Sequence, residues 1–164
     1  MNIFFLDKTP EKSAQYLCDK HIPKMLLESA QMLSTAVQTH IGKVDYLYKS
    51  AYPNHPMTKW VGLNKGNFDW AFQNANCIGQ EYFKRFNKIH KSSKILLNIL
   101  SNNHREYIPT GEFTEPPQCM PDEYKDKCSI KAYWNYYIGE KHVVANPKTE
   151  KIYSTIPGTV TTAP

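Results

Sequence analysis

An apolar stripe between residues 22 and 37 constrains the fold more than any other feature of the sequence. Its members recur at steps of three or four residues, the spacing of one helix face: Ile22, Leu26, Ala30, Leu33 and Val37. A polar stripe runs beside it at similar steps: His21, Lys24, Glu28, Gln31 and Thr35. This stretch therefore predicts an amphipathic helix with one buried face.

The polar stripe has two interpretations. It places an imidazole, an ammonium, a carboxylate and an amide along one face of the helix. Together such groups can bind a phosphate, a sugar hydroxyl and a base edge. Lys24 and Glu28 also have the spacing of an ordinary surface pair, which supports a helix by about 0.2–0.5 kcal/mol. The stripe thus either lines a binding site or is a solvated face.

Proline and glycine indicate where this helix begins and ends. Pro23 cannot lie deep inside a helix, so we expect a break near residues 21–22 and the main helix over residues 23 to about 40, ended by Gly42. A helix start at Pro23 would present free backbone N–H groups and the positive end of its dipole beside Lys24, an arrangement that binds anions.

The N-terminal residues predict two further elements. Residues 3–6 are apolar and favour a short strand or an extended segment in the core. Thr9 and Pro10 are typical of an N-cap and a first helical position, which predicts a first helix over residues 10 to about 19.

A long helical pattern over residues 61–89 follows the step Asn54-His55-Pro56. Trp60, Asn64 and Asn67 lie on a face that His55 could share, so these residues, with Asn54, are candidates for ligand binding. Packing and capping are the alternative. The end of the pattern is basic and includes Arg85, a further candidate. We also expect a short helix over residues 94–100.

The last third of the chain combines a loop with an aromatic helix. Residues 101–127 lack periodicity and contain four prolines, which indicates an ordered loop against the core. Residues 129–138 predict a short helix stopped by Gly139. Its four rings cannot all face the core, so some should lie at a partly open surface beside Lys141: Tyr133, Trp134, Tyr136 and Tyr137.

These elements together predict a mainly α fold, a compact helical bundle with a long Pro-rich loop. Residues 142–146 and 151–156 could pair as a short C-terminal β-hairpin. No linker divides the chain, so we expect one helical domain over residues 1–158 and a frayed tail over 159–164.

Composition limits the function classes. The net charge of +5 suits an anionic partner, and the aromatic content of 13% suits stacking on bases as well as an ordinary core. No apolar run approaches the roughly 20 residues of a membrane span, and residues 1–6 are too short for a signal peptide, so we expect a cytoplasmic protein. Phosphate-loop, dinucleotide, zinc-protease and serine-hydrolase motifs are absent from the sequence, and we expect no cofactor.

The four cysteines lack the spacing of zinc sites, so we expect reduced thiols and no metal. A site that mixes Cys119, Cys128 and a histidine is the open alternative.

Several motifs resemble a family of small bacteriophage proteins over about residues 1–141. The resemblance rests on Cys18-Asp19-Lys20-His21, Glu28-Ser29-Ala30-Gln31, the Asn-His-Pro step, the loop Cys119-Met120-Pro121-Asp122-Glu123-Tyr124-Lys125, and the segment from Ala132-Tyr133 to Lys141. A phage origin implies the cytoplasm of the host cell. It also implies a role that phage proteins of this size can have, the capture of host immune nucleotides such as cyclic dinucleotides or cyclic ADP-ribose isomers.

The layout is more distantly similar to the phage pyrimidine-dimer DNA glycosylase of the endonuclease V type. That enzyme is a compact helical domain with an early Pro flanked by basic residues and a late aromatic segment that touches DNA. The residues that would match are Lys20, Pro23, Lys24, Trp134, Tyr136, Tyr137, Gly139 and Lys141.

The resemblance implies a nucleophilic N-terminal α-amine and a glutamate two residues before the helix proline. The sequence has His21 at that glutamate position. Asn2 is too large for ready removal of the initiator methionine, so the amine would belong to Met1, and Glu28 would have to supply the carboxylate.

Two functional hypotheses follow. The first is a binding protein that captures a nucleotide-derived small molecule in a cationic, aromatic pocket, either as a monomer or as a homo-oligomer. Its ligand-binding residues would be His21, Lys24, Glu28, Gln31, Asn54, His55, Trp60, Asn64, Arg85, Tyr133, Trp134, Tyr136, Tyr137 and Lys141. The alternative is a glycosylase or lyase that acts on damaged or modified DNA, with Met1 and Glu28 as the catalytic residues. A purely structural phage component would leave the polar stripe without a role.

Overall fold

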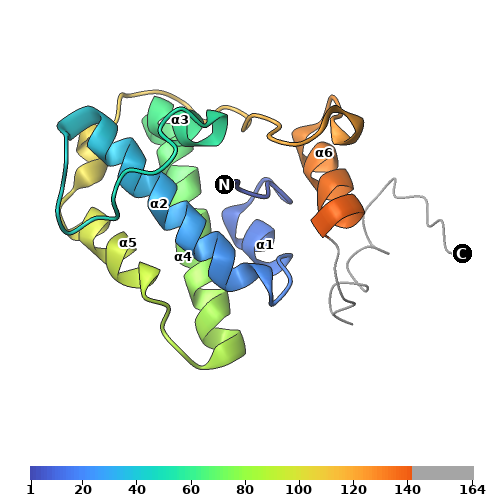
Figure 1. Ribbon diagram of the computed structural model, residues 1–164, viewed down its shortest axis with the longest axis horizontal. Coiled ribbons are helices and arrows are strands. Elements are labelled where there is room, and N and C mark those ends of the chain that lie inside the picture. Colours follow the sequence, from blue (N-terminus) through green and yellow to red (C-terminus); the bar gives the residue numbers. More distant parts are fainter. Residues whose placement is uncertain (142–164) are drawn as a thin grey trace, which may run out of the picture.

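Two long helices form the centre of the molecule, and three of the shorter helices pack around them (Figure 1). The computed structural model describes residues 1–141. α2 and α4 pack against each other, α1 packs on α4, and α3 and α5 pack on α2. The helices are α1 (Pro10–Gln15), α2 (His21–Ile41), α3 (Pro56–Leu63), α4 (Lys65–Phe86), α5 (Ser92–Ser101) and α6 (Ser129–Tyr136). The predicted mainly α fold is thus confirmed. Residues 1–141 contain no strand, and the predicted hairpin lies outside them.

The apolar stripe of α2 is buried as its spacing predicts. Ile22, Leu26 and Leu33 are fully enclosed in the core. The helix begins at His21, so the predicted break at residues 21–22 and the start at Pro23 are wrong. Pro23 is the third residue of the first turn, where a backbone N–H has no partner inside the helix, and its missing donor therefore costs little.

The first helix is shorter than expected. α1 starts after Thr9 with Pro10 at its first position, as predicted, but it ends at Gln15 and does not reach residue 19. The guanidinium of Arg85 binds the carbonyl oxygens of Gln15 and Leu17. These carbonyls therefore have partners outside a helix, and the chain turns towards α2.

The continuous pattern over residues 61–89 divides into two helices at Asn64. Its backbone is extended, with φ −158°, and its side chain accepts a hydrogen bond from the N–H of Asn67. The Pro-rich loop packs at this junction, where Lys65 N–H donates to Pro109 O and Gly66 N–H donates to Gly111 O. The local cap and the loop together override the apolar periodicity.

The N-terminal segment passes through the core to α6. Residues 3–6 are extended and buried, as expected. The indole N–H of Trp134 in α6 donates to Leu6 O at 2.8 Å. Gly139 does not stop this helix, contrary to the prediction, because the chain continues as a π-helical turn, η3 (Tyr137–Lys141). The ring of Tyr124 lies where a Cβ of Gly139 would be, so this glycine permits close packing.

Candidate functional site

The N-terminal α-amine lies beside a carboxylate of α2. The buried segment 3–6 brings Met1 to the polar stripe, and the Met1 nitrogen lies 3.9 Å from Glu28 Oε2. The Asn2 N–H donates to the same oxygen at 3.0 Å. The Glu28 side chain keeps 16% of its surface exposed, so the carboxylate still meets solvent. This pair of groups is the centre of the candidate site.

The Pro-rich loop and α6 hold the N-terminus in place through Asn2. Its side-chain amide donates to Cys119 O at 2.9 Å, and its Oδ1 lies 3.3 Å from the Tyr133 hydroxyl. That hydroxyl donates to Pro117 O at 2.6 Å. Burial holds the pKa of Tyr133 well above its usual range, so the hydroxyl remains a donor. In the sequence, Asn2 stood out only for its size, and its anchoring role was not predicted.

Two basic groups complete the site, Lys24 and His55. Lys24 Nζ lies 3.9 Å from Glu28 Oε1, the oxygen that Asn2 leaves open. His55 caps α3, and its Nδ1 accepts the N–H of Met57 at 3.1 Å. Burial lowers the pKa of His55, the Met1 ammonium lowers it further, and the Glu28 carboxylate opposes both effects. His55 is therefore neutral at neutral pH, with its proton on Nε2.

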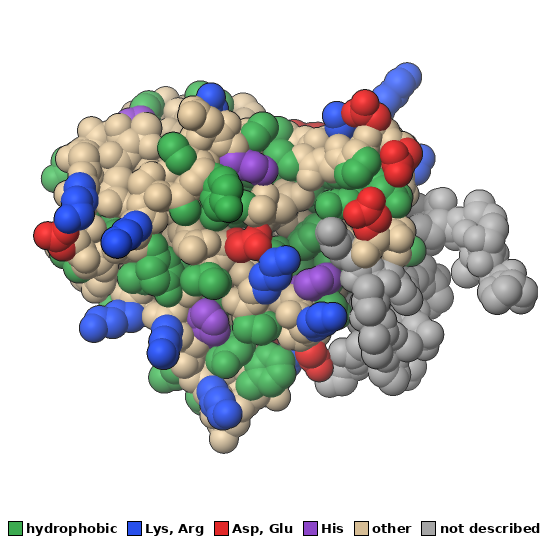
Figure 2. Space-filling view, viewed as in Figure 1, with side chains coloured by type: hydrophobic (Ala, Val, Ile, Leu, Met, Phe, Trp, Pro, Cys, Tyr) green, Lys and Arg blue, Asp and Glu red, His purple; other side chains and the backbone are tan. Residues whose placement is uncertain are grey.

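These groups meet at the molecular surface. Figure 2 shows an acidic side chain near the middle of the visible face, over α2, with lysine and histidine side chains around it. Gln31 lies one turn beyond Glu28 on the same helix and is half-buried. The polar stripe is thus partly open to solvent along the first half of α2.

His21 belongs to a neighbouring cluster. Its Nδ1 lies 2.8 Å from the hydroxyl of Tyr137, and its ring stacks on Phe4 with centroids 5.8 Å apart. It begins α2 two turns before Glu28, and its ring contacts the aromatic residues around Phe4 and the thiol of Cys18.

Several other predicted site residues have internal contacts. The buried indole of Trp60 donates to Thr114 O, and Asn64 caps α4. Arg85 pairs with Glu81 and Asp19 as well as with the two carbonyls of the turn after α1. Each of these three residues thus makes contacts within the fold.

The late aromatic residues pack mostly inward. Tyr133, Trp134 and Tyr137 are buried, and only Tyr136 is half-exposed, against Phe4 and Tyr124. The expected open surface therefore reduces to one of the four rings. Asn54 is exposed before α3, and Lys141 ends η3.

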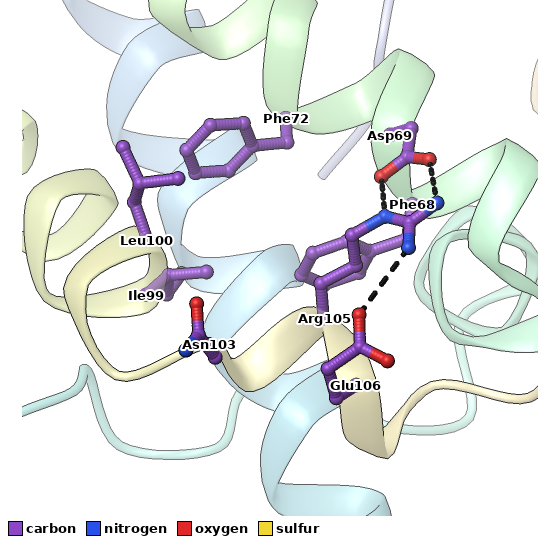
Figure 3. Close-up of a pocket in the computed structure, with 8 residues that line it drawn as sticks. All are labelled: Phe68, Asp69, Phe72, Ile99, Leu100, Asn103, Arg105 and Glu106. Atoms are coloured by element: carbon purple, nitrogen blue, oxygen red, sulfur yellow. Dashed lines mark hydrogen bonds and ion pairs between the residues drawn. The ribbon is translucent and has the colours of Figure 1, made fainter.

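A separate pocket lies between α4, α5 and the 3-10 turn η1 (His104–Tyr107) (Figure 3). It has a volume of about 180 Å³ and contains none of the predicted site residues. Arg105 at its edge makes two hydrogen bonds of 2.6 Å with Asp69 and a further contact with Glu106. Because the guanidinium is already paired, the pocket offers no free cation for an anionic ligand.

The described part of the chain contains no group of three or more histidine, cysteine or acidic side chains arranged to hold a metal ion. Among residues 1–141, no helix is both long enough and apolar enough to cross a membrane.

A helical fold and an α-amine beside a carboxylate are what the resemblance to a class of DNA-repair enzymes implies. Comparison with known families matches residues 1–94 to the family described as pyrimidine dimer DNA glycosylase. This match covers more than half of the chain, and the chain therefore belongs to that family. It includes Met1, Glu28 and His55 and ends before the Pro-rich loop. No curated protein and no solved structure matches the chain. The family supports the DNA glycosylase alternative better than the nucleotide-capturing protein.

Proposed function

We propose that the protein cleaves N-glycosidic bonds in damaged or modified DNA, with the Met1 α-amine as nucleophile and Glu28 as its partner. The observation that carries the proposal is the 3.9 Å separation between the amine and the Glu28 carboxylate. The family resemblance implies a glutamate where this chain has His21. Glu28, two turns further along α2, supplies the missing charge from another position.

The proposed reaction needs both groups. The amine, once neutral, attacks C1′ of the deoxyribose; the bond from C1′ to the base breaks, and the base leaves with the electron pair and takes up a proton. Opening of the sugar ring then gives an imine between the Met1 nitrogen and C1′. A carboxylate beside C1′ stabilises the positive charge that develops there, and it can accept the proton that the amine loses.

The two basic residues have complementary roles in this proposal. Lys24 is 64% exposed at its side chain and carries its charge one turn before Glu28, where a DNA phosphate could replace water around it. His55 presents an Nε2–H that can donate to the sugar or to the base. Because the imidazole is neutral, it adds no positive charge beside the amine.

A borohydride trap tests the proposal. The protein is mixed with a duplex that contains one abasic site and, separately, with a duplex that contains one thymine dimer, and sodium borohydride reduces any imine to a stable covalent bond. We expect a protein–DNA conjugate with both substrates and none with the undamaged duplex.

The matched variants are Glu28→Gln and Glu123→Gln. The first keeps the shape of the site but removes the charge, and we expect cleavage of the N-glycosidic bond at the dimer to slow about 10²–10³-fold. The second makes the same chemical change at an exposed glutamate of η2 (Asp122–Tyr124) and should leave the rate unchanged. Equal rates for Glu28→Gln and wild type would contradict the role of Glu28. Tight retention of an intact cyclic nucleotide, without any conjugate, would instead support nucleotide capture.

A further inference from the structure

A second cluster of reactive groups lies at the start of α2, outside the amine–glutamate site. Cys18 Sγ lies 3.3 Å from His21 Nδ1, and the Tyr137 hydroxyl lies 2.8 Å from the same nitrogen. The Tyr137 hydroxyl also accepts the N–H of Cys18 at 2.9 Å. A thiol, an imidazole and a phenol from two distant parts of the chain therefore converge on one point.

The position of Cys18 favours a negative charge on its sulfur. The N–H groups of His21 and Ile22 donate to the Cys18 carbonyl, so the thiol lies at the N-terminal end of the 21-residue helix α2. The positive end of a helix dipole and a nearby imidazole both stabilise a thiolate.

These contacts outweigh the cost of partial burial. Burial is the largest single influence and raises the pKa of Cys18, but the hydrogen bonds from His21 and Tyr137 and the charge of His21 together lower it to about 7. The pKa of Cys77 and that of Cys119 are instead raised, chiefly by burial. Cys128 is the exposed cysteine among the four.

We propose that the contacts of Cys18 with His21 and Tyr137 activate it as a thiolate and make it a site of modification by low-molecular-weight disulfides. The Cys18 thiolate attacks one sulfur of the disulfide, and a new S–S bond forms as the old one breaks. The leaving thiolate takes the electron pair and then a proton from solvent, so the exchange needs no other oxidant. The product is a mixed disulfide at the first turn of α2.

Bis(2-hydroxyethyl) disulfide, which is small and neutral, is a suitable probe. The reduced protein is exposed to it at pH 7, the reaction is stopped with acid at intervals, and mass spectrometry of peptides measures modification at each cysteine. About half of Cys18 is thiolate at this pH, against about one hundredth of an ordinary thiol. A thiolate of lower pKa is a weaker nucleophile than the thiolate of an ordinary cysteine, which offsets part of that advantage. We therefore expect Cys18 to react about fivefold faster than an ordinary thiol.

The order of modification decides the proposal without any variant. Exposure alone would make Cys128 react first, whereas activation of Cys18 as a thiolate makes Cys18 react first. Modification of Cys128 ahead of Cys18 in the wild-type protein would overturn the proposal.

The role of the imidazole is tested with His21→Phe, which retains a ring between Phe4 and Tyr137 but removes Nδ1. We expect Cys18 to slow about fivefold and Cys128 to keep its rate. His40→Phe replaces an exposed histidine at the other end of α2 and is the matched control. An unchanged Cys18 rate in folded His21→Phe would also overturn the proposal. If that variant fails to fold, the wild-type order still gives the answer.

Discussion

Asn2→Leu is the substitution that best separates the position of the Met1 amine from the chemistry of Glu28. Leucine has nearly the shape of asparagine, and like asparagine it is too large for ready removal of Met1. It leaves the Asn2 N–H bonded to Glu28 but removes two side-chain hydrogen bonds, from the amide to Cys119 O and from the Ile3 N–H to Oδ1. It also removes the longer contact of Oδ1 with the Tyr133 hydroxyl, which keeps its hydrogen bond to Pro117 O. At about 1 kcal/mol each, loss of the two side-chain hydrogen bonds lowers the free energy of unfolding by about 2 kcal/mol.

Urea and thermal unfolding measure this loss. For a chain of this size, about 2 kcal/mol corresponds to a fall in Tm of roughly 4–8 °C. Because Asn2 also fixes the direction of the N-terminus, we expect borohydride trapping to slow about 10–100-fold. Asn76→Leu makes the same change at an exposed position of α4 and should affect neither quantity. A folded Asn2→Leu protein with wild-type stability and trapping rate would refute the anchoring role.

Three further outcomes follow from particular contacts. Acetylation of the Met1 amine removes a charge that lowers the pKa of His55, so NMR titration should show that this pKa rises. An unchanged pKa of His55 would contradict the electrostatic contact between the two groups. The pKa of His55 is lower in the folded state than the unfolded value of about 6.5, so on acidification the unfolded chain takes up its proton first. Urea titrations at a series of pH values should therefore show that the stability contributed by this residue is complete above pH 6.5. That contribution should decline as the pH falls towards the folded pKa. Gly66→Ala should cost about 1–3 kcal/mol because its Cβ would collide with the Phe113 backbone, whereas Gly79→Ala, with ordinary contacts, should not destabilise; equal Tm values would contradict this packing.

Local patterns predicted the helices well where packing follows the sequence period. The stripe from Ile22 to Val37 is buried, and Gly42, with φ +83°, ends α2 as expected. The errors in helix bounds arose where one residue type is compatible with two local structures. Pro23 is compatible with a helix that begins two residues earlier, and Asn64 interrupts a period that its apolar neighbours continue.

The candidate site was predictable only in part, because it joins residues that are far apart in the sequence. Lys24 and Glu28 share a helix face, and their proximity follows from their spacing. The approach of Met1 to Glu28 depends on how residues 3–6 pass through the core, and the anchoring of Asn2 depends on Cys119, over a hundred residues away. No periodicity encodes such contacts.

The aromatic residues of α6 show the same limit. Their density indicated a surface for stacking on bases, but Tyr133 and Trp134 are buried against the N-terminal segment and bond to its polar atoms. Composition alone could not distinguish a stacking surface from a support for the N-terminus.

Identification of the nitrogen that becomes linked to DNA tests the central claim most directly. The borohydride-reduced conjugate with abasic-site DNA is digested with protease and nuclease, and tandem mass spectrometry locates the sugar remnant on the peptide. The proposal predicts that the remnant lies on the α-amine of Met1. A remnant on the side chain of Lys24 or of another lysine, or no conjugate at all, would contradict it.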